Sequence, residues 1–340
     1  SLTRRVSIKS TSRRVSVSFQ PIRLVPFTRN PPFLLRSGKA RVSVLGTLLP
    51  SNQYLTRAAR VTVDFAAYVA VRGLVAVIQT LPLDMGDSLC RSLAWLAAGP
   101  MRIRHGVIEQ NLAMVFPDAD DESRRRLTLA MWHHLLLMVC EIAWAQRRLH
   151  LVNWSQHVRF LEAKKMLHHY LSGRPVVSVT GHYGNFEVGG YVTGLMGFET
   201  LAIARTLDNR FLHRWVEEFR GAKGQRMVDK QGCANRVEQH LQSNGILALL
   251  ADQHAGSKGC WVDFLGVLAS SHKALALFSL SSDAPMLVGF MRRVDRRPMQ
   301  FELGLSGIVD PLDDAEGTCA SVTTLTQWYN DKLAEAIAPA

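Results

Sequence analysis

The sequence is poor in cysteine and lacks the short motifs of several enzyme classes. Its five cysteines are scattered, and no two of them form a C-x-x-C pair: Cys90, Cys140, Cys233, Cys260 and Cys319. This spacing argues against a zinc site or a disulfide framework and fits a reducing compartment. The sequence also has no G-x-S-x-G elbow and no catalytic-cysteine context. We therefore expect no covalent nucleophile, no metal ion and no organic cofactor.

Acidic residues are missing from the first 63 positions, which contain twelve of the 40 lysines and arginines. The remaining chain has 28 basic and 28 acidic residues, so the net charge of +12 belongs to this segment alone. Residues 1–60 are rich in Arg and Ser and show no regular period, which predicts a disordered basic tail. Such a tail is attracted to an anionic membrane surface, and its composition also resembles an organellar transit segment. No nucleic-acid motif accompanies the charge, so we expect no nucleic-acid partner.

Long uncharged runs are also missing. Residues 61–81 are apolar apart from Asp64 and Arg72, and a second apolar segment covers residues 89–98. Because no window of 18 residues is free of charge, a conventional spanning helix is not expected. The two segments predict a helical hairpin over residues 61–100 that lies in the membrane interface, with a buried core hairpin as the alternative.

Residues 101–340 alternate between helical and strand patterns and have enough apolar residues for one catalytic domain. The pattern predicts an α/β fold with a largely parallel sheet flanked by helices. Strands are expected near Val176, at 201–204, 226–228, 246–250 and 286–291, and near Phe301; helices are expected at 102–116, from 118 to about 148, after Asn185, at 210–220, 233–243 and 271–282, and from about Val322. Gly256, Gly259 and Gly266 predict a mobile loop over the site between two of these elements.

One histidine stands at the end of a predicted buried strand. The β-branched run 176–180 leads through a glycine turn to His182, and Asn185 is a candidate N-cap for the helix that follows. Glu187 then lies in the first helical turn, five positions after the histidine. The same spacing occurs at His157 and His213, but both lie in polar, helix-like surroundings. We therefore interpret His182 and Glu187 as a base and its orienting carboxylate.

Two other patterns suggest a metal site and a nucleotide-binding loop, but the spacing of their residues argues against both. His133, His134 and Glu141 resemble a set of metal ligands, but adjacent histidines on a helix point about 100° apart, which argues against a metal site. The glycines of residues 181–190 do not have the spacing G-x-G-x-x-G and are not followed by the expected acid, which argues against a nucleotide-binding loop.

The segment His182-Tyr-Gly-Asn-Phe-Glu187 is followed in order by Ala204-Arg-Thr-Leu-Asp-Asn209, Leu249-Leu-Ala-Asp-Gln253 and Phe264-Leu-Gly266. This series resembles the bacterial lipid A late acyltransferases, the lauroyl and myristoyl transferase family, over residues 61–310. These enzymes belong to the glycerolipid acyltransferase superfamily, which has a histidine and an acid separated by four residues. The chain departs from the usual family pattern at Phe186 and Thr206, which leaves the acceptor open.

The resemblance implies transfer of a fatty acyl group from an acyl thioester to a hydroxyl of a membrane glycolipid. Acyl-carrier protein or acyl-CoA would be the donor, and the acceptor would be a lipid A precursor, a mannosylated glycolipid or a lysophospholipid. The protein would lie on the cytoplasmic face of the inner membrane, peripheral or monotopic, and act in lipopolysaccharide biosynthesis. A membrane-peripheral binding protein with a degenerate active site is the alternative from another class.

The expected roles follow from the chemistry of acyl transfer. His182 would take the hydroxyl proton and Glu187 would fix the tautomer of its imidazole. Arg205 would bind phosphate, and Asn185 with the backbone amides of residues 183 and 184 would stabilise the oxyanion. The resemblance adds three residues to the substrate site: Asn209, Asp252 and Gln253. If the strands are parallel, His182, Arg205, Asp252, Gln253, Arg292 and Arg293 converge on one edge of the sheet.

Overall fold

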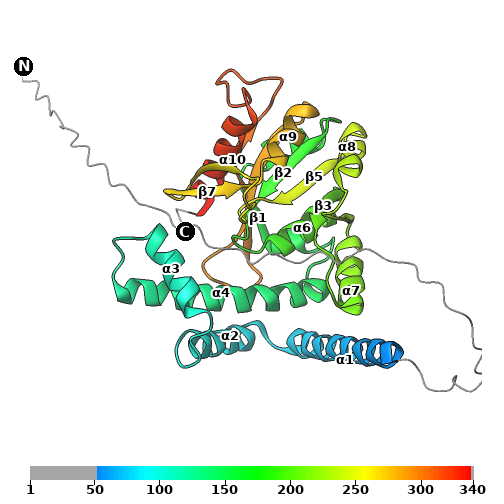
Figure 1. Ribbon diagram of the computed structural model, residues 1–340, viewed down its shortest axis with the longest axis vertical. Coiled ribbons are helices and arrows are strands. Elements are labelled where there is room, and N and C mark those ends of the chain that lie inside the picture. Colours follow the sequence, from blue (N-terminus) through cyan, green and yellow to red (C-terminus); the bar gives the residue numbers. More distant parts are fainter. Residues whose placement is uncertain (1–51, 338–340) are drawn as a thin grey trace, which may run out of the picture. The chain divides into compact units, whose positions relative to one another are not determined.

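The computed structural model describes residues 52–337 of the chain (Figure 1). Most of the predicted basic tail, residues 1–51, lies outside the described residues. Residues 52–60 do not belong to a tail, because the first helix, α1, begins at Asn52. The remaining part of the chain, Asn52–Ala340, forms one compact unit.

The centre of this unit is a seven-stranded sheet with the order β1-β9-β8-β2-β5-β3-β4. Five neighbouring strands, β8, β2, β5, β3 and β4, run parallel to one another, as predicted. Strand β9 is antiparallel to β8. The bounds are β1 (Val158–Phe160), β2 (Val176–Thr180), β3 (Thr200–Ala204), β4 (Gln225–Asp229), β5 (Ile246–Leu250), β8 (Met286–Arg293) and β9 (Phe301–Val309). The prediction of a largely parallel α/β sheet is confirmed.

Helices cover both faces of the sheet (Figure 1). One face packs against α8 (Ala234–Gln242), α9 (Ala274–Ser281) and α10 (Val322–Ile337) through a core that includes Leu247, Met286 and Tyr329. The other face packs against α6 (Phe186–Leu195), which in turn contacts the long helix α4 (Asp121–Arg148). The other helices are α3 (His105–Val115), α5 (Ala163–Tyr170) and α7 (Arg210–Gly221), with a short 3-10 turn at Trp154–Gln156.

Strand β2 is central, between β5 and β8, and its sequence explains why. Val176, Val177 and Val179 are fully buried, so both faces of the strand are covered by apolar side chains. Parallel strands covered on both faces have continuous apolar runs of this kind. The position of β2 in the middle of the sheet places whatever follows Thr180 between the carboxyl ends of two neighbours.

The predicted mobile loop around Gly256, Gly259 and Gly266 is wrong. Most of this segment is an antiparallel hairpin of β6 (Cys260–Phe264) and β7 (Val267–Ser271). Leu265 and Gly266 join the strands, and both have positive φ, which is the geometry of a two-residue hairpin turn with the twist that strands require. Gln327 of α10 bonds the backbone N–H and C=O of Asp263, so the hairpin is held on the body of the protein.

A second layer of helices lies beyond α6. Helix α1 (Asn52–Thr80) and helix α2 (Leu83–Ala98) both pack against α4. The fully buried Trp144 of α4 donates a hydrogen bond to the carbonyl of Ile78 at 2.7 Å, and its ring lies so close to Gly86 that a Cβ there would be 2.5 Å away. Helices are therefore present over most of residues 61–100, but α1 and α2 follow one another along α4 and do not pack against each other, so the predicted hairpin is wrong (Figure 1).

Within residues 52–337, two helices are long and apolar enough to cross a membrane by length and composition. They are Thr56–Thr80 and Asp121–Arg148. In the most apolar 18-residue window of each helix, 6% of the first and 33% of the second is buried inside the protein. Neither was expected from the sequence, because no window of 18 residues is free of charge, although both helices contain apolar windows with at most two charged residues. Helix α4 contacts α1, α2 and α6 and thus belongs to the packed body of the protein.

Candidate active site

His182 lies directly beyond the carboxyl end of β2, where a neighbouring strand supplies a carboxylate. The parallel register pairs Thr180 of β2 with Leu250 of β5, so the residues two positions further on, His182 and Asp252, lie side by side. Asp252 Oδ2 accepts from the His182 backbone N–H at 2.6 Å, and Oδ1 lies 2.7 Å from the imidazole Nδ1. The sheet thus fixes both the backbone and the ring of His182 on one carboxylate.

These contacts determine the tautomer of the imidazole. Because a carboxylate only accepts, Nδ1 carries the proton and donates it to Asp252. Nε2 is then unprotonated, and its lone pair accepts a hydrogen bond from the Gln253 amide at 3.3 Å, which a substrate hydroxyl would replace. The side chain of His182 is 37% exposed, so a substrate can reach Nε2. An imidazole in this state is ready to take a proton from a hydroxyl group.

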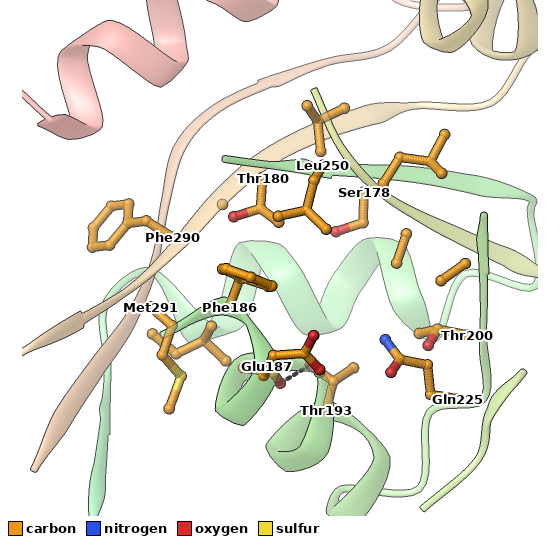
Figure 2. Close-up of a pocket in the computed structure, with 18 of the residues that line it drawn as sticks. Ser178, Thr180, Phe186, Glu187, Thr193, Thr200, Gln225, Leu250, Phe290 and Met291 are labelled. Carbon is orange, nitrogen blue, oxygen red and sulfur yellow. Dashed lines mark hydrogen bonds between the residues drawn. The ribbon is translucent and has the colours of Figure 1, made fainter. Parts of the chain in front are cut away.

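Glu187 does not make the contact that the sequence analysis predicted for it. Its carboxylate forms a two-point ion pair with the guanidinium of Arg220 on α7, with one of the two distances at 3.0 Å. The Glu187 side chain lines the space between α6 and the sheet (Figure 2). Asp252, which was expected to bind substrate, instead makes the orienting contact with His182.

The turn between His182 and α6 is docked tightly on β8. Gly184 has φ +68°, and a Cβ at this position would lie 1.8 Å from the Met291 carbonyl oxygen, so only glycine fits. The next residue, Asn185, donates its backbone N–H to the same oxygen at 2.7 Å. The Asn185 side chain accepts from the Val188 N–H, which confirms the predicted N-cap of α6.

A cavity of about 160 Å³ lies between α6 and the sheet (Figure 2). In Figure 2, Phe186 and Phe290 lie at one side of the cavity and Thr200 and Gln225 at the other. The ring of Phe186 also packs edge-on against the His182 imidazole, with 4.9 Å between ring centroids. The cavity exists because small residues face each other across it: Gly189, Gly190, Ala202, Ala204, Ala248 and Gly289. The cavity is mainly apolar, and Phe186 lies between it and the histidine as a contact of both.

The structure separates the other predicted site residues into exposed and structural ones. Arg205 follows β3 and is 84% exposed, with Asp208 as its ion-pair partner at 3.7 Å. Asn209 is the N-cap of α7, and its amide donates to the carbonyl of Asp64 on α1. Asn185 is 1% exposed, and its side chain binds protein atoms. The two asparagines therefore hold helices in place.

The edge of the sheet gathers most of the residues that the parallel arrangement predicted. His182, Asp252 and Gln253 are in contact, and Arg292 and Arg293 are the last two residues of β8, the other neighbour of β2. The three side chains weighed as metal ligands have different partners. His133 binds Asp87, His134 binds the Gly184 carbonyl, and Glu141 binds Arg293.

Sequence reasoning did not find the role of Arg220 or that of Glu141. Arg220 lies near the end of α7, whose many charged residues are typical of a solvated helix. It reaches Glu187 because α7 packs beside β4 and α6. Glu141 was considered only as a metal ligand, although a carboxylate in the apolar segment 135–145 was itself a signal, because such a group is buried only with a partner.

The fold and the site together have the features of an α/β acyltransferase, with an oriented histidine beside an apolar cavity. Residues 55–340 match the family model described as bacterial lipid A biosynthesis acyltransferase, and the chain belongs to this family. The family resemblance stated from the motifs is thus confirmed.

Individual proteins are also similar to this chain. The lipid A biosynthesis lauroyltransferase of Escherichia coli (strain K12) is 21% identical over 276 residues, which cover 78% of this chain and 84% of the relative. The crystal structure of the 1-acyl-sn-glycerophosphate acyltransferase of Thermotoga maritima matches with a TM-score of 0.36 and 11% identity, covering 76% of this chain and 97% of that one.

Proposed function

We propose that this protein transfers a fatty acyl group from an acyl thioester to a hydroxyl group of a lipid A precursor. The observation that carries the proposal is the His182 imidazole, held by Asp252 on Nδ1 and 37% exposed, which packs against Phe186, a residue that lines a mainly apolar cavity. A base next to a cavity of this kind suits the two halves of the reaction, proton transfer and the binding of an acyl chain. Membership of the lipid A acyltransferase family supports the same chemistry.

In this mechanism Nε2 of His182 removes the proton from the acceptor hydroxyl while the oxygen attacks the thioester carbonyl carbon. Asp252 stabilises the imidazolium that forms. The carbon–sulfur bond then breaks, and the imidazolium returns the proton to the departing thiolate, so the enzyme ends in its starting state. The backbone amides of residues 183 and 184 would bind the oxyanion of the tetrahedral intermediate. The acyl chain would occupy the cavity beneath α6.

The helical layer would bring the site to the membrane. Helices α1 and α2 expose large apolar side chains that a water-soluble surface rarely groups together: Val63, Val69, Leu74, Val77, Met85, Leu89, Leu93 and Trp95, each between 42% and 67% exposed. A surface of this kind, followed by a catalytic body, fits an enzyme that lies on the membrane containing its acceptor. We place it on the cytoplasmic face, where acyl-carrier protein and acyl-CoA are available.

The proposal is tested by measuring acyl transfer with the purified full chain in detergent or vesicles, with acyl-acyl-carrier protein or acyl-CoA as donor and lipid A precursor as acceptor. His182→Ala should lower kcat by about 10²–10⁴-fold while the melting temperature stays close to that of the wild type. Mass spectrometry of lipids from cells with and without the protein identifies the acceptor. Wild-type turnover by folded His182→Ala would refute the mechanism, and transfer to a lysophospholipid alone would refute the acceptor.

The two carboxylates near the histidine make different predictions. Asp252→Asn keeps the shape of the side chain but no longer favours the Nδ1–H tautomer, so kcat should fall by about 10²–10⁴-fold. Glu187→Gln weakens the ion pair with Arg220, so its main effect should be a lower melting temperature. Its kcat should fall less than that of Asp252→Asn. The opposite ranking of the two kcat values would restore Glu187 as the orienting group.

A further inference from the structure

A carboxylate that the reaction does not use lies behind the catalytic turn. Glu141, in the last third of α4, is completely buried, and Arg293 at the end of β8 is 10% exposed. The guanidinium donates to both oxygens of Glu141, from Nε at 2.8 Å and from Nη2 at 2.7 Å. This two-point ion pair joins α4 to the end of β8, at the edge of the sheet.

The same carboxylate also holds the turn that carries His182. Glu141 Oε2 accepts from the Asn185 amide at 3.0 Å, and Oε1 accepts from the Met299 backbone N–H at 3.1 Å. Asn185 begins α6 and donates its backbone N–H to Met291. One side chain of α4 therefore connects the catalytic turn, the end of β8 and the segment before β9.

His134 makes a second connection one residue earlier in the turn. Its Nε2 donates to the Gly184 carbonyl at 3.2 Å, and its Nδ1 accepts from Arg293 Nη1 at 3.2 Å. Burial and the neighbouring Arg293 cation lower the pKa of His134, which favours the neutral ring that this pattern requires. Both Gly184 and Asn185 are thus fixed by side chains of α4, two and three positions from His182.

Stability alone does not account for this arrangement. A buried ion pair loses about as much through desolvation as it gains through attraction, and apolar residues of similar volume often replace one without loss. What apolar residues cannot replace is the set of hydrogen bonds from Glu141 and His134 to the turn. The contacts are therefore better explained by the position of the turn than by the stability of the fold.

We propose that Glu141 and Arg293 form a buried clamp that positions the catalytic turn and, through it, the His182 imidazole. The proposal rests on the proposed function, in which His182 is the base. Glu141 and Arg293 are positioning residues, since neither is expected to touch the substrate. Helix α4 then has two functions: it packs against the membrane-facing helices α1 and α2, and it supports the active-site turn.

The most direct test removes the hydrogen bond between Asn185 and Glu141 and keeps the N-cap of α6. In Asn185→Ser the hydroxyl can still cap α6, because serine and asparagine are equally good N-caps, but it is too short to reach Glu141. We expect kcat to fall by about 10- to 100-fold with KM nearly unchanged, because a displacement of about 1 Å at a catalytic group has an effect of this size. The melting temperature should change little. A wild-type kcat in this variant would overturn the proposal.

A second variant separates positioning from stability. In Glu141→Met/Arg293→Met the pair is replaced by apolar side chains of similar length, so the fold should be kept while kcat stays low. Recovery of wild-type kcat in the folded double variant would show that the pair is only structural. If the double variant does not fold, Asn185→Ser decides the question alone. Asp310→Asn is the control, because it breaks the two-point ion pair with Arg174 at the opposite end of β2 and should lower stability without lowering kcat.

Hydrogen exchange distinguishes a failure of the clamp from a failure of the proposed function. In Asn185→Ser the amides of residues 182–188 should exchange faster than in the wild type, while those of β2 and β5 stay protected. This measurement needs no substrate. Faster exchange in a protein without acyl-transfer activity would keep the clamp and refute the function. Unchanged exchange would refute the clamp whatever the activity.

Discussion

His182 and Asp252 are 70 residues apart in the sequence and meet because their strands are neighbours in register. The histidine motif contains an acid of its own, Glu187, but helix geometry turns that side chain towards Arg220. Two acids near one histidine thus have separate environments: Asp252 holds the imidazole and Glu187 lines the cavity with its cationic partner. The contact with the imidazole and the lining of the cavity thus belong to different carboxylates.

At the residue scale, Arg205 is the side chain whose function is most open to a direct test. Its ion pair with Asp208 is long and exposed, and such pairs contribute little to stability. Arg205→Lys keeps the charge but loses the planar fork, so KM for a phosphate-bearing acceptor should rise by about tenfold or more while the melting temperature stays the same. Steady-state kinetics over a range of acceptor concentrations measures this.

Arg214→Lys is the matched control for Arg205. It is equally exposed, at 83%, and pairs with Glu218 on α7. We expect no change in its kinetics. If Arg205→Lys also leaves KM unchanged, Arg205 has no role in phosphate binding and belongs to the solvated surface.

At the element scale, α6 and the sheet form the cavity because their facing residues are small. Gly190 faces Gln225 across it, and a Cβ at Gly190 would lie 2.9 Å from the Gln225 amide nitrogen, which is the end of a flexible side chain. A larger residue at this position can therefore enter the cavity while the helix stays in place. Gln225 lies at the side of the cavity opposite Phe186 and Phe290, so such a residue would fill that side (Figure 2).

Gly190→Leu should shift the preference of the enzyme towards shorter acyl chains. The longest donor that the wild type uses should lose at least tenfold in kcat/KM, whereas donors several carbons shorter should be affected less, because only a long chain reaches the filled side. A series of donors of increasing chain length measures the shift. Gly221→Leu, at a glycine with open space around it, is the control. An unchanged chain-length preference would place the acyl chain elsewhere.

At the scale of the whole molecule, charge and apolar surface are separated along the chain. The basic excess belongs to the first 63 residues, whereas α1 and α2 carry a series of exposed apolar side chains from Val63 to Leu96. Deleting residues 61–98 would uncover Trp144 and disturb the fold. The carbonyl of Ile78 accepts a hydrogen bond from the Trp144 indole, and Gly86 packs against the Trp144 ring. Substitution of exposed residues is the sharper experiment.

We expect the two parts to bind vesicles in different ways. Replacing Val63, Val69, Leu74 and Val77 with serine should abolish flotation with vesicles at low and high salt, because the contact is apolar. Deleting residues 1–50 should weaken binding to anionic vesicles only at low salt, since exposed charges are screened beyond about 10 Å at 0.1 M. Loss of flotation at every salt concentration after the tail deletion alone would contradict the assignment of membrane binding to α1.

Local patterns in the sequence were sufficient for many of the elements and for the location of the site, but not for β1, α5 or the hairpin of β6 and β7. The apolar run of β2, the glycine turn and the N-cap at Asn185 are set by neighbours in the chain, and the structure contains all three. The pattern of alternating strands and helices also predicted a parallel sheet, which brings His182, Asp252 and Gln253 to one edge. Each of these features depends on period and composition over a few residues.

The partners of the charged groups were decided only by the tertiary structure. Asp252 reaches His182 because β5 lies beside β2, Arg220 reaches Glu187 across 33 residues, and Arg293 reaches Glu141 across 152. The order of strands and the packing of α4 and α7 against α6 arise from the burial of many apolar side chains at once. Spacing in the sequence carries no information about such contacts, and for this reason it suggested the acid five positions from His182 where the fold supplied the one seventy positions away.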